Sequence, residues 1–117
     1  MLIDQFISYI EAEKRFSPLT VEAYQSDMDQ FAQYLRDKFE IEDLTQVKTT
    51  MVKSFIVHLK EEGLSNRSIN RKMSTLRTFY KYCLREDLME KSPMTGIKAL
   101  TPVMGDFSSR FSRRQYL

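Results

Sequence analysis

Residues 66–86 read NRSINRKMSTLRTFYKYCLRE, and this stretch decides the fold because it combines a helical period with a one-sided charge distribution. Its apolar side chains recur at spacings of three and four residues, which predicts one buried face of a helix. Ser65 is suited to cap the start of that helix, and the period continues to about Leu88. The expected buried face consists of Ile69, Met73, Leu76, Tyr80, Cys83 and Leu84.

On a wheel of about 100° per residue, a second set of side chains lies nearly opposite this apolar face. We call this set the basic stripe; it consists of Arg67, Arg71, Ser74, Thr78, Lys81 and Arg85. A solvated helix face usually mixes charges of both signs. In addition, Arg67 in the first turn and the acids Glu86 and Asp87 in the last oppose the helix dipole. Helix stability alone therefore does not explain the stripe.

The charge of the whole chain is polarised around this helix. Residues 65–85 hold six basic and no acidic side chains, whereas the other residues hold 12 basic and 16 acidic ones, so the net charge is only +2. Such a stripe is typical of proteins that bind phosphate backbones, and arginine also pairs with guanine edges. Asn70 and Arg77 flank it. The alternative is a solvated face that pairs with the acids of residues 37–43 or 61–62.

Three further helices are predicted before Ser65, at about residues 2–14, 18–38 and 49–62. Ser17 and Pro18 form a typical helix start, and Gly63 a typical helix end. Residues 39–48 lose the helical period and gather acids, which indicates a connecting loop pinned by Ile41, Leu44 and Val47. No strand is predicted, so the fold class is an all-α bundle of four helices.

Length and composition favour one domain, because 117 residues suffice for a single core. We expect a DNA-binding domain at residues 1–89 and a linker or tail at 90–117, where the period disappears. No segment is apolar enough to span a bilayer, and Asp4 stands where a signal peptide is basic, so we expect a cytoplasmic protein. Cys83 is the only cysteine, and we expect it to be buried. No metal, cofactor or small-molecule ligand is expected.

Two segments together resemble a known family: SPLTVEAYQSDMDQFAQYL (17–35) and GLSNRSINRKMSTLRTFYKYCLREDLMEKSPM (63–94). They are similar to the N-terminal core-binding domain of tyrosine recombinases, a group that includes phage integrases and chromosome-dimer-resolution recombinases. The similarity rests on the spacing of Ser17, Thr20, Tyr24 and Asp27, and on the serine, arginine, Leu-Arg and Phe-Tyr pattern of residues 65–80.

This resemblance implies a SAM-like orthogonal bundle that forms half of a clamp around double-stranded DNA, with the second and fourth helices facing the major groove. It implies that Ser17 and Thr20 reach phosphates, although Ser17 also fits a plain helix cap. It further implies contacts with other recombinase protomers, because such enzymes act as tetramers on paired sites.

In the family that the sequence resembles, a separate C-terminal domain cleaves DNA with a tyrosine nucleophile, and we expect no such domain in this chain and no enzymatic activity of its own. His58 is followed by Leu-Lys-Glu, so it cannot supply a His-x-x-Arg element, and a surface or boundary position is expected for it. Tyr116 lies beside Arg113 and Arg114, but a loose tail cannot hold the positive groups that phosphoryl transfer requires.

The candidate DNA-binding residues divide by their position in the predicted fourth helix. Arg67, Asn70 and Arg71, in its N-terminal half, are the candidates for base edges. The later residues are candidates for phosphates: Ser74, Arg77, Thr78, Lys81 and Arg85.

Two other function classes are open. A helical protein-interaction module would use Tyr34, Phe39 or Tyr82 as exposed aromatic side chains. A helix-turn-helix regulator fits less well, because the predicted fourth helix is too long for that motif.

Overall fold

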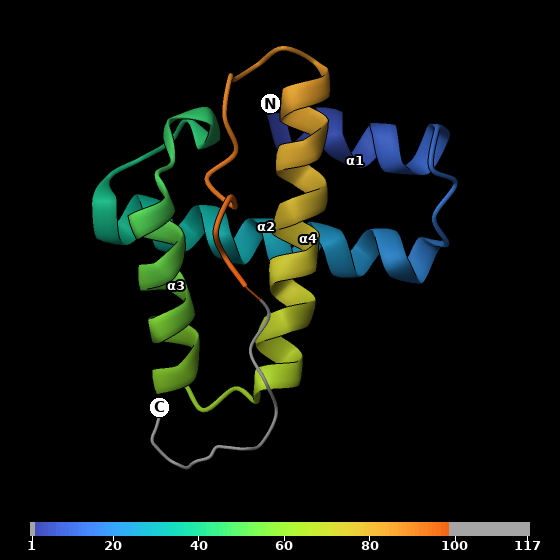
Figure 1. The fold of residues 1–117 in the computed structure, drawn as a ribbon. Helices are drawn as coiled ribbons and strands as arrows, with labels where there is room; N and C mark the ends of the chain where they lie inside the picture. The colour runs from blue at the N-terminus through green and yellow to red at the C-terminus, as the bar shows by residue number, and fades with distance from the viewer. Residues whose placement is uncertain (1, 99–117) are drawn as a thin grey trace.

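The computed structural model describes residues 2–98, and within this range the fold consists of α-helices and one short 3-10 helix (Figure 1). The elements are α1 (Leu2–Ala12), α2 (Pro18–Phe39), η1 (Leu44–Gln46), α3 (Thr49–Glu61) and α4 (Asn66–Arg85). Residues 2–98 contain no strand. The predicted all-α bundle of four helices is therefore confirmed.

The helices form two antiparallel pairs (Figure 1). One pair is α1 and α2, and the other is α3 and α4, which crosses α2 steeply. Both α3 and α4 pack against α2. Helix α4 is thus supported from behind by α2 along one side, and its opposite side faces away from the bundle.

Within residues 2–98, a residue with positive φ follows each of the four α-helices: Arg15, Glu40, Gly63 and Asp87. At α1 and α4 such a turn ends the helix before the predicted residue, at Ala12 and Arg85. After α4, Asp87 adopts a left-handed conformation (φ 58°), and the Leu88 N–H donates to the Cys83 carbonyl (2.9 Å). The helix therefore ends at Arg85, before the predicted residue 88. Glu40 takes the same conformation after α2, and Gly63, as predicted, takes it after α3.

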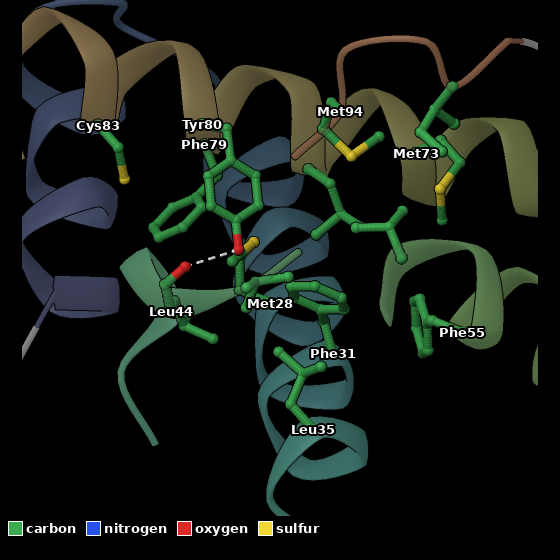
Figure 2. Packing of buried hydrophobic residues seen from close by; sticks show 14 of the residues in the cluster. Met28, Phe31, Leu35, Leu44, Phe55, Met73, Phe79, Tyr80, Cys83 and Met94 are labelled. Carbon is green, nitrogen blue, oxygen red and sulfur yellow. Dashed lines mark hydrogen bonds between the residues drawn. The ribbon is translucent and has the colours of Figure 1, made fainter. Parts of the chain in front are cut away.

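The core lies where the four helices meet, and aromatic side chains are among its largest members. The rings of Phe6 and Phe79 meet edge to face with centroids 5.2 Å apart, as do those of Phe31 and Phe55. Figure 2 shows Tyr80 pointing down from α4, where its buried hydroxyl donates to the Leu44 carbonyl at 2.9 Å. This bond ties α4 to the connection between α2 and α3.

The predicted buried faces are largely confirmed. Ile69, Met73, Leu76, Tyr80 and Cys83 of α4 are all buried. Leu84 was predicted to share this face but is 36% exposed, because it lies at its edge in the last turn of the helix.

The segment that follows α4 packs back onto the bundle. Met94 and Ile97 belong to the core, and Thr49 at the start of α3 donates its hydroxyl proton to the Pro93 carbonyl (2.9 Å). The sequence predicted a linker or tail from residue 90, and residues 93–97 of that segment lie against the helices. The division into a domain and a linker stays a prediction, and Arg113, Arg114 and Tyr116 lie outside the described residues.

Within residues 2–98, no helix is both long and apolar enough to cross a membrane.

Candidate nucleic-acid interface

The basic stripe lies on the face of α4 that points away from the core. Ser65 caps the helix by accepting a hydrogen bond from the Ser68 N–H (3.2 Å), and burial of the apolar face fixes the rotation of the helix. The stripe residues and the two that flank it, Asn70 and Arg77, differ in exposure. Arg67, Arg71, Ser74, Lys81 and Arg85 are exposed, and Asn70, Arg77 and Thr78 are half-buried.

Arg71 is held by a buried carboxylate of α2. Its two terminal nitrogens donate to the two oxygens of Asp27, at 2.8 Å and 3.0 Å. The Asp27 side chain is 2% exposed, whereas that of Arg71 is 53% exposed. The guanidinium therefore joins α2 and α4, and about half of the Arg71 side chain remains exposed.

Two more α4 side chains complete this cluster, which we call the Asp27 cluster (Asp27, Arg71, Lys72 and Thr75). Lys72 donates to Asp27 Oδ1 at 3.0 Å, and the buried Thr75 hydroxyl donates to Oδ2 at 2.7 Å. The carboxylate thus receives four hydrogen bonds, three of them from cationic donors. These hydrogen bonds and charges offset the loss of hydration that burial of the carboxylate causes.

Arg85, at the far end of the stripe, fastens α4 to α1. It donates to Glu13 at 3.1 Å, and its guanidinium lies 4.9 Å from the centre of the Tyr9 ring. The hydrogen bond to Glu13 raises the pKa of Arg85 above its ordinary value. Glu13, and Glu86 at 3.7 Å, are therefore ion-pair partners of Arg85 within the domain.

Arg77 and Thr78 also have intramolecular partners. Arg77 donates to the Ile97 carbonyl at 3.2 Å, so it anchors the segment after α4. The Thr78 hydroxyl donates back to the Ser74 carbonyl at 3.0 Å.

Arg67 and Lys81 differ from the other cations of the stripe, because no described residue forms an ion pair with either of them. Both are exposed.

The alternative interpretation of the stripe named the wrong partners. The ion pairs of the basic stripe go to Asp27, Glu13 and Glu86, not to the acids of residues 37–43 or 61–62.

The start of α2 has the predicted capping geometry. Ser17 Oγ accepts from the Thr20 N–H at 3.3 Å and lies 2.9 Å from the Thr20 hydroxyl oxygen. Ser17 is exposed and Thr20 half-buried. In Figure 1 this end of α2 extends to one side of α4, so the two residues are placed beside the stripe's helix rather than within the stripe.

The comparisons with known proteins identify the family. The family model for the phage integrase N-terminal SAM-like domain matches residues 3–87. The chain belongs to this family. A tyrosine recombinase XerC of Oceanobacillus iheyensis is 38% identical over 108 residues, covering 90% of this chain and 35% of that protein. One of Anoxybacillus flavithermus is 37% identical over 91 residues, covering 78% and 30%.

A third XerC, of Leptospira interrogans, is 38% identical over 92 residues, which are 78% of this chain and 29% of that protein. The chain thus spans about a third of the length of the curated relatives it matches. No solved structure gives a significant match.

Sequence analysis of this SAM-like domain missed the Asp27 cluster. It placed Asp27 in the family spacing and Arg71 in the stripe, but it did not connect them, and it left out Lys72 and Thr75. A signal was present, since Asp27 lies three residues after Tyr24 and four before Phe31, on the apolar face of α2. An acid at such a position needs a partner from another helix.

The aromatic side chains considered for protein binding are half-buried, not exposed. The Tyr82 ring lies 4.8 Å from that of Tyr9, and the Tyr34 ring packs on Phe39 and on His58. His58 is likewise half-buried, which agrees with the surface or boundary position expected for it. These aromatic side chains serve the packing of the SAM-like domain itself.

Proposed function

We propose that this domain binds the double-stranded DNA of a recombination site through the exposed face of α4, as one part of a tyrosine recombinase. The observation that carries the proposal is the exposed stripe on a helix with no acid from residue 66 to 85. Phosphate backbones attract such a face, and a helix fits the major groove. Family membership and the XerC relatives support the same conclusion.

The contacts of these side chains within the domain support different proposed roles for the stripe residues and for Asn70 and Arg77. Arg67, for which helix position alone suggested a base edge, is now proposed to bind a phosphate together with Lys81, since neither has an ion-pair partner in the part of the chain that the structure describes. Asn70, Arg71 and Ser74 lie between them and face the groove. Arg77, Thr78 and Arg85 are secondary contacts, because their side chains already bind within the domain.

Helix α2 contributes a second contact through Ser17 and Thr20 at its start, and neighbouring protomers on the same DNA contribute further contacts. We place strand cleavage outside residues 2–98. Arg71, Arg77 and Arg85 bind within the domain and tie α4 to α2, to the segment after it and to α1.

The test is a salt series of fluorescence anisotropy with a mixed-sequence duplex of about 30 base pairs. Each phosphate neutralised contributes about −0.9 to the slope of log K against log salt. The variant Arg67→Ala/Lys81→Ala should therefore flatten the slope by about 1.8. Lys53→Ala, which removes an exposed cation from α3, is the control and should leave the slope unchanged. Equal effects of the two variants would contradict the proposal.

A further inference from the structure

The Asp27 cluster combines a fully buried acid with a half-exposed base. Asp27 is 2% exposed, and its partner Arg71 is 53% exposed. A pair formed only for stability would have no need to leave the guanidinium at the surface of the proposed DNA-binding face. This difference in exposure indicates that the buried Asp27 holds Arg71 while part of the Arg71 side chain stays accessible to a ligand.

The hydrogen bonds show how the guanidinium is held. Asp27 accepts one bond from each terminal nitrogen of Arg71. A guanidinium has five N–H donors in one rigid plane, so this pairing fixes the plane and leaves other donors pointing away from the carboxylate. Arginine side chains otherwise lose much rotamer freedom when they bind, and a preformed orientation removes that cost.

The carboxylate itself is fixed by two further donors. The Thr75 side chain is almost completely buried and bonds to Oδ2, and Lys72, with a side chain 15% exposed, bonds to Oδ1. Because both come from α4, the orientation of Arg71 is tied to the helix that carries the stripe.

We propose that Asp27 is a positioning residue for DNA recognition, which holds the Arg71 guanidinium so that its outer N–H groups read one base edge. This inference rests on the proposed function. It assigns to Asp27 two effects on DNA binding. The carboxylate fixes the direction of the arginine, and its negative charge offsets one of two neighbouring positive charges, Arg71 and Lys72.

These two effects separate affinity from selectivity in the variant Asp27→Asn. Loss of the negative charge strengthens binding to phosphates of any sequence, so the salt slope should become steeper by up to about 0.9. Loss of the rigid pairing lets the guanidinium rotate, so the preference at one base pair, about 5- to 150-fold for a well-placed arginine, should disappear. If Asp27 had a purely structural role, Asp27→Asn would lower the affinity and the preference together, because it would only lower the folded fraction.

The experiment uses the full chain and a duplex library with a randomised core, from which bound sequences are selected and counted. The wild-type chain should show one position with a strong preference, and Asp27→Asn should lose it while binding the unselected library more tightly. Asp29→Asn is the matched control, because Asp29 lies on the same helix with an exposed carboxylate. It should keep the wild-type preference.

A second variant keeps the proposal testable if Asp27→Asn does not fold. Arg71→Lys retains the charge but not the planar set of N–H donors, so it should keep the salt slope and lose the preference for one base pair. The proposal is overturned if Arg71→Lys or a folded Asp27→Asn retains the wild-type preference, or if the wild-type chain has none. None of these results affects the salt slope of Arg67→Ala/Lys81→Ala, which tests DNA binding by the stripe separately.

Discussion

Replacement of Asp27 by alanine should be among the most destabilising single changes in this domain. It leaves the buried Thr75 hydroxyl without its acceptor and the mostly buried Lys72 ammonium without its counter-charge. Removing one partner of a buried charge pair costs about 3–5 kcal/mol. Arg71 is half exposed and regains water, so we expect the lower end, about 3 kcal/mol. For a domain of this size, that corresponds to a fall in Tm of roughly 12–24 °C.

The assay is urea unfolding followed by circular dichroism, with thermal unfolding as a second measurement. The midpoint should fall without a change in the denaturant slope, because the surface buried in the native state stays the same. Asp29→Ala is the control; its carboxylate is exposed and, within residues 2–98, accepts hydrogen bonds from Gln25 alone, so it should cost less than about 0.5 kcal/mol.

Two results would refute the reasoning. The first is a cost of Asp27→Ala no larger than that of Asp29→Ala. The second concerns the triple variant Asp27→Leu/Arg71→Ala/Lys72→Met, which removes all three charges and fills the site with apolar groups. It should be more stable than Asp27→Ala, since no buried charge is left unpaired. Equal instability of the two would mean that the helices fail to pack there for another reason.

Four further predictions concern the core and the turns. Tyr80→Phe leaves the Leu44 carbonyl without its donor and should cost about 1–3 kcal/mol in urea unfolding, without loss of helix content. Burial raises the pKa of Cys83 to about 12, so iodoacetamide at neutral pH should label it only after unfolding. Because the unfolded thiol loses its proton first, stability should also fall as the pH rises above the ordinary thiol pKa of 9.0. Gly63→Ala should cost about 1 kcal/mol or more, because φ is +89° there; a neutral result would contradict the strain argument.

Helical periodicity was sufficient to predict the fold class because each helix buries one continuous face. The apolar spacing along residues 66–86 placed Ile69, Met73 and Tyr80 in the core and, by exclusion, the stripe on the surface. Helix ends were less predictable. Asp87 and Glu40 adopt left-handed conformations that favour glycine, but neither is a glycine, so the sequence does not indicate these turns. Of the three turns after α2, α3 and α4, only the one at Gly63 could be predicted from the residue type.

Contacts between distant parts of the chain account for the rest of the differences. Met94 and Ile97 carry no period, so only the three-dimensional packing shows that they belong to the core. The pairing of Asp27 with Arg71 spans 44 residues and depends on how α4 crosses α2. For the same reason, the sequence could place Arg77 and Arg85 beside or in the stripe but could not show that both already bind within the domain.

The most direct test of DNA binding by α4 is a heteronuclear NMR titration of the labelled chain with a duplex. Our account predicts that the largest changes in amide chemical shift occur on α4, from Arg67 to Lys81, with smaller changes at Ser17 and Thr20. Amides of the exposed α3 residues Lys53 and Val57 should change little. Changes concentrated on α3, with α4 unaffected, would contradict the account.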